Sequence, residues 1–350
     1  MKVLFVGDTR SSSTALHYYS AMIRVGCDVL PFNPGFFEVR HLPERVFLAL
    51  KKAPIPFRVR RISDEFVRIL KKNQFDLIFV VSENFLGFDS LEEARKSSRR
   101  APLFLYHSHD NNFSPGILKP KDFEKTLAAY DFVFTTKAHN VAVYKSLGVS
   151  QCAFLPSAFD PSIHRPIPDE DSSYGSALFD VSFVGTYAPC RDPVIKALET
   201  NQVRIWGNGW SRSPHFRTKP KLISDTSIYY YELADVISHT KCSLGLLRQG
   251  AGDFHTQRTF EIPACGSLQF APRNDEILSF FKEDQEIICY ASLEELTEKV
   301  AFYLRHDPQR AKIASAGYDR VVRDNHTYLN RVSMMLDRVK HSDLRHVHFR

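Results

Sequence analysis

The stretch from residue 250 to residue 266, GAGDFHTQRTFEIPACG, holds two carboxylates at a spacing suited to ligand binding. Asp253 stands eight positions before Glu261, and Arg258 lies between them. If a helix begins near Thr259, Glu261 falls in its first turn, where the carboxylate can face a bound ligand. An ionised carboxylate only accepts hydrogen bonds, so Glu261 suits vicinal hydroxyls such as the pair on a ribose.

The same stretch offers groups that bind phosphate. The guanidinium of Arg258 can hold phosphate oxygens through two parallel hydrogen bonds, and the alternative is that it pairs with Asp253 or Glu261. Open backbone N–H groups at a helix start, with glycines before them, also favour an anion. One short segment could therefore hold a ribose, a diphosphate and a sugar.

Two glycine-containing loops could complete this donor-binding side. Gly185 and Thr186 follow the apolar run 179–184, and a loop glycine lets backbone N–H groups approach a phosphate closely. A second loop, WGNGW at 206–210, offers two indole rings on which a base or a sugar can stack, unless these rings pack in the core. Its donor-binding candidates are Gly207, Asn208 and Gly209.

A polar cluster in the first half of the chain could perform acid–base chemistry. The apolar run 102–106 ends in His107, Ser108, His109 and Asp110. Either histidine could act as a base near neutral pH with Asp110 as its partner, and we take His109 as the first choice. Another polar group ends the first apolar run of the chain and should line an acceptor side of the site; it consists of Gly7, Asp8, Thr9 and Arg10.

Apolar runs alternate with amphipathic segments along the chain, which indicates an α/β fold with parallel sheets. Residues 76–81 form an unbroken apolar run, as expected of a parallel strand covered on both faces. The alternation stops in a Pro-, Ser- and acid-rich segment and restarts at Phe179. We therefore expect a first domain at 1–160, a linker at 161–177, a second domain at 178–325, and a last helix with a tail at 326–350.

The wording of the second half resembles a known family. RTFEIPACGS, followed by LQFAPRNDEI and the tail from ICYASLEELTEKV onward, resembles the CgeB-like (spore maturation protein-like, glycosyl transferases group 1) branch of the GT-B nucleotide-sugar glycosyltransferases. Asp253 and Glu261 match the acid-x7-Glu signature of that superfamily, whose first acid is usually glutamate. The resemblance implies two Rossmann-like domains, each with a parallel sheet, that face a cleft, and a last helix that crosses back to the first domain.

The resemblance also implies roles for single residues. Glu261 would hold the ribose of the donor, and Asp253, one methylene shorter than the usual glutamate, would contact the donor sugar. The His-Asp step at 109–110 is similar to the step in many retaining GT-B enzymes, in which the histidine reaches the donor sugar. His109 would then sit at the reaction centre, with His107 as the alternate.

Composition excludes several other classes of protein. A hydrophobic content of 43% with 25% charged residues is typical of a globular chain, and no apolar run approaches the ~20 residues that span a bilayer. The six cysteines lie apart without metal-ligand spacing, and no strand precedes the acidic run Asp169–Asp171 to hold it rigid. We therefore expect no disulfide, no bound metal and no cofactor.

The excess of positive charge lies in residues 1–165, which carry 23 Lys and Arg against 16 Asp and Glu, and it is concentrated between residues 51 and 100. This excess forms either solvated helix faces or a patch for an anionic membrane or an anionic acceptor. No recognised motif supports nucleic-acid binding. The opening MKVLFVG is too short for a signal-peptide core, so we expect a cytoplasmic protein, with a peripheral position at the inner membrane face as the further expectation.

These observations together predict a glycosyltransferase. The substrate would be a nucleotide-diphosphate sugar such as a UDP-, GDP- or dTDP-sugar, and the acceptor a hydroxyl of a glycan or a lipid-linked glycan. Transfer would proceed without a metal and with retention rather than inversion of the anomeric configuration. The alternatives are an inactive sugar-nucleotide-binding protein of the same fold and a nucleotide-sugar epimerase.

Overall fold

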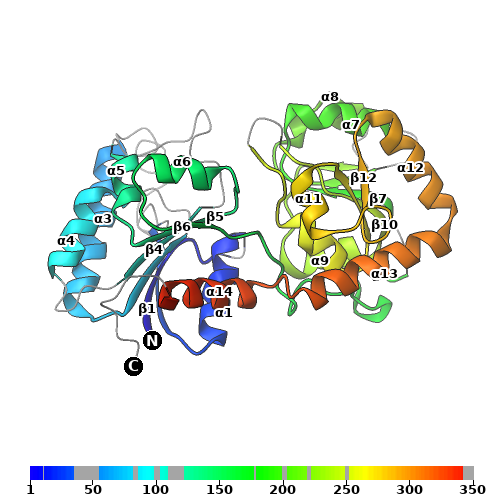
Figure 1. Cartoon of the computed structure of the whole chain (residues 1–350). Helices are drawn as coiled ribbons and strands as arrows, with labels where there is room; N and C mark the ends of the chain where they lie inside the picture. The colour runs from blue at the N-terminus through cyan, green and yellow to red at the C-terminus, as the bar shows by residue number, and fades with distance from the viewer. Residues whose placement is uncertain are drawn as a thin grey trace. The chain divides into compact units, whose positions relative to one another are not determined.

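The computed structural model describes residues 1–10, 12–34, 55–81, 86–97, 103–108, 122–176, 179–198, 203–218, 222–248 and 252–341. The chain forms two compact units, and each is described by itself (Figure 1). The first unit comprises Met1–Pro156 together with Leu329–Arg350, and the second comprises Ser157–Tyr328. The segment 161–177, expected to be a linker, therefore lies inside the second unit.

The first unit contains a six-stranded parallel sheet in the order β2-β1-β3-β4-β5-β6. Its central strand Leu77–Val81 is apolar and buried along its whole length, as expected of a parallel strand that helices cover on both faces. The strands are β1 (Lys2–Val6), β2 (Asp28–Phe32), β3 (Leu77–Val81), β4 (Leu103–Ser108), β5 (Phe132–Thr135) and β6 (Cys152–Phe154).

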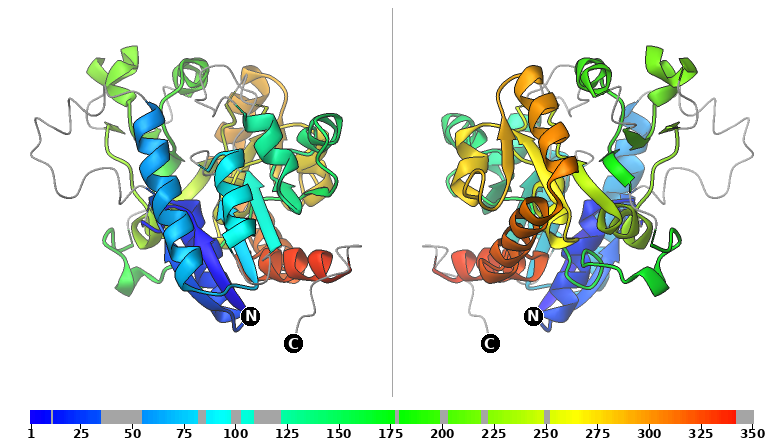
Figure 2. Two further views of the ribbon diagram at one scale, coloured as in Figure 1. Left: turned by 90° about the vertical axis from the view of Figure 1, so that its left-hand side faces the viewer. Right: turned by 90° about the vertical axis from the view of Figure 1, so that its right-hand side faces the viewer.

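Helices connect these strands, and one helix joins them from the far end of the sequence. Helices α3 and α4 run side by side along one flank (Figures 1 and 2). The helices are α1 (Thr14–Arg24), α3 (Ile55–Lys72), α4 (Phe88–Ser97), α5 (Phe123–Ala128), α6 (Asn140–Ser146) and α14 (Tyr328–His341). Ser13 begins α1 by accepting a hydrogen bond from the Ala15 N–H at 3.2 Å, as expected of an N-cap serine.

The second unit repeats this plan with a six-stranded parallel sheet in the order β12-β11-β10-β7-β8-β9. Its strands are β7 (Phe179–Val184), β8 (Arg204–Trp206), β9 (Ile223–Ser224), β10 (Thr240–Leu244), β11 (Leu268–Pro272) and β12 (Ile288–Tyr290). Its helices are α7 (Asp192–Ala197), α8 (Pro214–Thr218), α9 (Tyr230–Ser238), α10 (Arg258–Ala264), α11 (Asp275–Phe280), α12 (Leu293–Arg305) and α13 (Asp307–Arg323). The predicted α/β class, with a parallel sheet in each half, is confirmed.

Alternation along the strands explains why the second sheet is covered on both faces. Phe270 belongs to an apolar cluster with side chains of α7 and α12. The next residue, Ala271, points to the opposite face and belongs to a cluster with Phe260 of α10 and Val321 of α13. Small residues on that second face let α10 approach the sheet closely.

The strand order creates a topological switch point in each unit. In the second unit the chain moves outward from β7 to β8 and β9, then returns to place β10 on the other side of β7. In the first unit the equivalent point lies between β1 and β3. Open α/β sheets bind ligands outside the carboxyl ends of the strands at such points. These two places are therefore where a site is expected.

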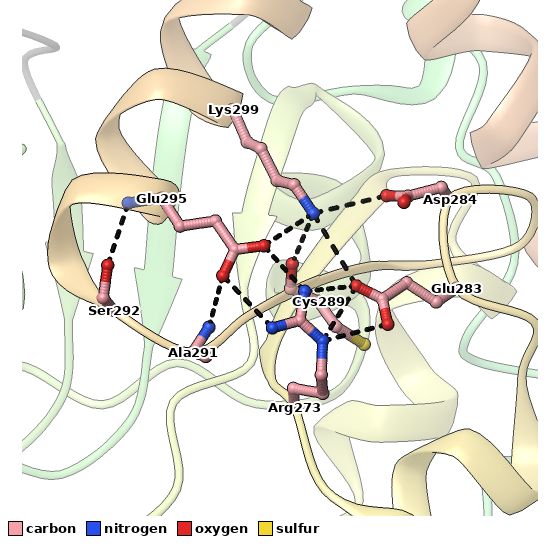
Figure 3. Close-up of polar contacts among 8 residues, drawn as sticks. All are labelled: Arg273, Glu283, Asp284, Cys289, Ala291, Ser292, Glu295 and Lys299. Carbon is pink, nitrogen blue, oxygen red and sulfur yellow. Dashed lines mark hydrogen bonds and ion pairs between the residues drawn. The ribbon is translucent and has the colours of Figure 1, made fainter.

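An ion network ties α12 to the carboxyl ends of β11 and β12 (Figure 3). Arg273, which follows β11, donates from Nε to Glu283 at 3.0 Å and from NH1 to Glu295 at 3.2 Å. Lys299 contacts Glu295 at 3.0 Å and donates to the Cys289 carbonyl at 2.9 Å. Because Glu295 also accepts the Ala291 N–H at 2.7 Å, the first turn of α12 is fixed to the strand before it.

The segment expected to be a linker is attached to the second unit by polar contacts. The Ser172 hydroxyl donates to Asp235 of α9 at 2.6 Å, and the Ser173 N–H donates to the same carboxylate at 2.9 Å. Asp169, in a 3₁₀ turn at Asp169–Asp171, lies 3.4 Å from Nε2 of the buried His239. These contacts hold the segment along α9.

Candidate functional site

Two loops beside the switch point of the second unit pack directly on each other. The Gly185 N–H donates to the Trp206 carbonyl at 2.9 Å, and the Tyr187 N–H donates to the Asn208 carbonyl at 2.8 Å. A Cβ on Gly207 would lie 2.0 Å from the Gly185 carbonyl oxygen, so only glycine fits there. This close packing fixes Gly185 and Thr186 at the carboxyl end of β7, and leaves Thr186 and Asn208 exposed.

Arg191 joins the loop after β7 to the loop after β10. Its guanidinium donates from NH1 to the Thr186 carbonyl and from NH2 to the Leu246 carbonyl, the latter at 3.2 Å. The residue is 7% exposed, and its buried Nε makes no hydrogen bond within the described parts of the chain. Burial lowers the pKa of Arg191 to about 10, so the side chain stays charged at neutral pH and places a cation at the switch point.

The start of α10 differs from the expectation of open N–H groups. The Thr259 N–H donates to the Thr256 carbonyl at 3.1 Å, and the Phe260 and Glu261 N–H groups both donate to the Gln257 carbonyl at 2.9 Å. The buried Thr259 hydroxyl accepts the Thr256 N–H at 3.1 Å. The turn before the helix thus occupies these donors, so side chains must supply most of the binding groups here.

Glu261 is buried and is held from two sides. Its carboxylate is 4% exposed, and Oε2 accepts a hydrogen bond from NH1 of Arg258. Arg258 is fixed in turn by donating from Nε to the Val184 carbonyl at 3.2 Å, at the end of β7. On the other side, Oε1 lies 3.4 Å from Nε2 of His164. The sequence left open whether Arg258 pairs with Asp253 or Glu261, and in the structure it pairs with Glu261.

Asp253 is buried on the same edge of the sheet. Its side chain is 3% exposed and accepts a hydrogen bond from Nε of Arg248 at 3.0 Å. The charges of Arg248, Asp253 and Arg258 all act on the pKa of Arg191, after the larger effect of its burial. Arg248 thus pairs with Asp253 and Arg258 with Glu261, and both pairs lie close enough to Arg191 for their charges to act on it.

Trp210 and His255 have packing roles in the second unit. Trp210 is fully buried and donates from its indole nitrogen to the Gly185 carbonyl at 2.9 Å. Its indole ring therefore packs beneath the surface against the glycine loops, and neither face of the ring is available for a base or a sugar to stack on. His255 accepts the Ser157 N–H at 2.9 Å and contacts Glu276 of α11 through Nδ1, so this histidine joins the first residue of the unit to α11.

In the first unit His107 is 0% exposed. Its Nε2 lies 3.1 Å from the hydroxyl of Tyr18 on α1, and the two rings are 4.7 Å apart. This burial points to a packing role for His107 rather than to contact with a substrate. His109 and Asp110, the other two predicted catalytic residues of this cluster, lie outside the described residues.

The loop after β1 is ordered around Asp8. The Asp8 carboxylate accepts from the N–H and Nε of Arg10 at 3.0 Å and 2.9 Å, and from Asn33 at 3.2 Å. Partial burial raises the pKa of Asp8, but these hydrogen bonds outweigh it and hold the pKa below its usual value. Gly7 donates to the Phe32 carbonyl at 3.1 Å, and Thr9 is half-buried. A charged, partly exposed carboxylate thus lies at the switch point of the first unit.

Arg191 and His164 belong to the site and were missed by sequence reasoning. Arg191 follows the Gly185 loop by six positions, just before a helix, and a basic residue between a strand-end glycine and the next helix could have been singled out. His164 stands in a segment without periodicity. Its spacing of four from Asp160, with the apolar Phe159 and Ile163 beside them, is the signal that could have indicated an ordered turn.

The described residues contain neither a metal-binding cluster nor a membrane-spanning helix. Within the ranges that the structure covers, no group of three or more His, Cys, Asp or Glu side chains is placed to hold a metal ion. Among those same residues, no helix has the length and apolar character needed to cross a membrane.

Comparison with known proteins connects this geometry to a family. Residues 191–337 match the family model described as glycosyl transferase-like. The spore protein CgeB of Bacillus subtilis (strain 168) is 23% identical over 209 residues, which is 55% of this chain and 63% of CgeB. The alignment therefore spans less than two thirds of that relative's length.

Solved structures with little sequence identity share the whole architecture. Anabaena HepE in complex with UDP superposes with a TM-score of 0.64 at 13% identity, over 97% of this chain and 100% of HepE. Sucrose-phosphate synthase from Thermosynechococcus elongatus superposes with a TM-score of 0.68 at 12% identity, over 97% of this chain and 98% of the synthase. The fold is GT-B. The resemblance predicted from the sequence is confirmed.

The matched segment 191–337 begins at Arg191 and includes the three arginines of the candidate site together with Asp253 and Glu261. It does not include the first unit's sheet or His164. The matched segment therefore contains most of the cluster at the β7–β10 switch point.

Proposed function

We propose that this chain is a glycosyltransferase that uses a nucleotide-diphosphate sugar. The observation that carries the proposal is the cluster at the switch point of the second unit. There a buried carboxylate, Glu261, pairs with Arg258 at the start of α10, while Arg191 and Arg248 follow β7 and β10 on the same edge of the sheet. Such a cluster matches the chemistry of a nucleoside diphosphate, which needs acceptors for its ribose hydroxyls and cations for its phosphates.

Each group would have a distinct role. Glu261 would accept hydrogen bonds from the ribose hydroxyls. Arg191, Arg248 and Arg258 would balance the charge of the diphosphate, which increases as the bond to the sugar breaks. Asp253, whose carboxylate is fixed by Arg248, would accept a hydroxyl of the donor sugar. UDP-sugars are the first donors to test, because the solved HepE complex contains UDP.

The reaction would transfer the sugar from a phosphate oxygen to a hydroxyl oxygen. The bond between the anomeric carbon and the diphosphate oxygen breaks, and the electron pair leaves with the diphosphate. The acceptor oxygen bonds to the anomeric carbon, and its proton passes to the departing phosphate or to a protein base. Retention is the outcome that the Asp253 and His109 pattern favours. With inversion, His109 or Asp110 would be the base.

The acceptor would be a hydroxyl of a glycan or a lipid-linked glycan, bound by the first unit. The carboxylate of Asp8, fixed by Arg10 and Asn33, supports this assignment because an oriented carboxylate binds sugar hydroxyls well. Its lowered pKa keeps it ionised at neutral pH.

A binding experiment with Glu261→Gln tests the proposal. This variant keeps the size of the side chain and removes the charge that Arg258 pairs with. We expect calorimetric binding of UDP to weaken by roughly tenfold or more, since a buried charged hydrogen bond is lost. Glu298→Gln, an exposed site on α12, is the matched control and should bind as the wild type does. Equal UDP affinity in both variants would contradict the assignment.

Turnover separates the proposal from its alternatives. Incubation with UDP-glucose and acceptor glycans should yield a glycoside, and the anomeric proton signal in NMR gives the stereochemistry. An epimerase would instead change the sugar nucleotide with no acceptor present. An inactive binding protein would bind UDP and release no product in either assay.

A further inference from the structure

His164 lies against Glu261 from a part of the chain that the family model does not reach. The histidine is 2% exposed, and the carboxylate is 4% exposed. A carboxylate so far from water needs polar or charged neighbours to remain ionised. Arg258 is one such neighbour, and the imidazole of His164 is the second.

The backbone around Asp160 fixes which nitrogen of His164 carries a proton. The Asp160 N–H donates to Nδ1 at 3.0 Å, so Nδ1 holds a lone pair. In the neutral imidazole the proton is therefore on Nε2, the atom that faces Oε1 of Glu261 at 3.4 Å. The histidine thus directs an N–H group at the carboxylate, at a separation slightly longer than an ordinary hydrogen bond.

The turn that carries His164 is itself held in place. Asp160 is buried and accepts both the N–H and the hydroxyl of Ser162, at 3.0 Å and 2.7 Å. The His164 N–H closes the turn by donating to the Asp160 carbonyl at 2.7 Å. His164 is therefore fixed by its own turn, and its position does not depend on Glu261.

The two neighbours act on different oxygens of Glu261. Arg258 holds Oε2 from within α10, and His164 faces Oε1 from the turn at 160–164. The terminal torsion of a glutamate is broad, so a contact on one oxygen does not by itself define the plane of the carboxylate. A second group on the other oxygen defines the plane of the carboxylate, and the remaining lone pairs then point in one direction.

We propose that His164 is a positioning residue for nucleotide binding: it orients the carboxylate of Glu261 so that the carboxylate can accept the ribose hydroxyls. This inference rests on the proposed function, since it requires Glu261 to bind a ribose. His164 itself need not touch the nucleotide. Its effect should therefore depend on the presence of the ribose hydroxyls.

Two substitutions by amide side chains test the roles of Nδ1 and Nε2 of His164 one at a time. His164→Gln places an amide N–H near the position of Nε2, so it can still donate towards Glu261. His164→Asn reaches only as far as Nδ1, so it can accept the Asp160 N–H and has no donor for Glu261. Thermal unfolding of both variants shows whether the turn is intact. His164→Gln guards against a result that reflects misfolding alone.

The ligands are UDP and 2′,3′-dideoxy-UDP, measured by calorimetry. We expect His164→Asn to bind UDP about tenfold more weakly than wild type and to bind the dideoxy nucleotide with unchanged affinity. His164→Gln should bind UDP to within about threefold of wild type. A packing role would instead reduce both affinities together, or reduce neither. Either of those results overturns the inference.

Nucleotide binding by the wild-type protein shows whether a negative result concerns the role of His164 or the proposed function as a whole. If the wild type binds neither UDP nor other nucleoside diphosphates, the proposed function fails, and the inference fails with it. If the wild type prefers UDP to its dideoxy form and His164→Asn keeps that preference, only the role of His164 is wrong. If His164→Asn does not fold, His164→Met replaces it, because Met has the length of Gln and no N–H donor for Glu261. Loss of the ribose preference in His164→Met with its retention in His164→Gln supports the inference, and the same preference in both variants overturns it.

Discussion

Arg191 shows how one buried side chain can shape a binding site. Its two hydrogen bonds connect the carbonyls of Thr186 and Leu246, on either side of the switch point. Replacing Arg191 by Met removes the donor to both carbonyls, and a buried acceptor left without a donor costs about 1–3 kcal/mol. We therefore expect Arg191→Met to lower the melting temperature by several degrees and, where it is still folded, to bind UDP about tenfold more weakly.

Calorimetry and thermal unfolding of Arg191→Met check both parts of this prediction. Arg212→Met is the matched control, because it also removes one positive charge but from an exposed position over the Tyr187 ring. If both variants lose affinity equally, overall charge and not the bridge between the loops controls binding.

The sequence predicted one half of the candidate site, because the residues of that half lie close together in the chain. Asp253, Arg258 and Glu261 lie within nine positions, so their spacing alone predicts that they meet. His164 reaches Glu261 across 97 positions, and no local pattern records that approach. The occupied N–H groups at the start of α10 were equally hidden, because the turn at 256–257 that binds them has no marked composition.

At the scale of elements, the network around Arg273 makes the stability of α12 depend on pH. Hydrogen bonds from Arg273 and from the Ala291 N–H lower the pKa of Glu295 to about 2. In the unfolded chain this pKa is about 4.5. A carboxylate with a lowered folded-state pKa stabilises the protein fully above the unfolded value, and this contribution is lost as the pH falls towards the folded value.

Glu295→Gln tests this dependence. The side chain is 29% exposed, so we expect a modest fall in melting temperature at pH 7. The difference from wild type should shrink steadily as the pH is lowered from about 5 towards 2. Glu298→Gln, on the exposed side of the same helix, should show no such trend. A difference that stays constant with pH would show that the ionised carboxylate is not the cause.

Strong periodicity predicted whole elements, and weak periodicity misplaced their ends. Strand β7 has the bounds of the apolar run 179–184. Strand β10 ends at Leu244, although the apolar run extends to Leu247. The loop after the strand begins at Gly245, and within it the Leu246 carbonyl accepts a hydrogen bond from Arg191. Strand β9 has two residues, which is too short for any pattern to mark it.

At the scale of the whole molecule, the boundaries of the two units differ from those that the sequence suggests, and the first unit is built from both ends of the chain. Proline, serine and acidic residues at 161–177 are typical of a linker, yet Asp235 and His239 bind that segment to the second unit. These partners are more than 60 positions away, so composition could not reveal them. The C-terminal segment from Leu329 belongs with Met1–Pro156, which only the resemblance to GT-B proteins indicated in advance.

Helix α14 should therefore stabilise a unit whose other residues lie far before it in the sequence. Val332 and Met335 on this helix are both 0% exposed, and Arg331 donates to the Pro156 carbonyl at 2.9 Å. We expect Met335→Ala to lower the stability of the first unit by about 2–5 kcal/mol, because it removes buried apolar contacts and leaves a cavity.

Hydrogen exchange followed by mass spectrometry locates this effect. In Met335→Ala, peptides that cover β1 and β3 should lose protection, since these strands belong to the same cooperative unit. Met334→Ala, one position away and 39% exposed, makes the same chemical change outside the core and should alter stability by less than ~0.5 kcal/mol. If β1 and β3 keep wild-type protection while α14 alone exchanges faster, the helix is an appendage, and the first unit is complete without it.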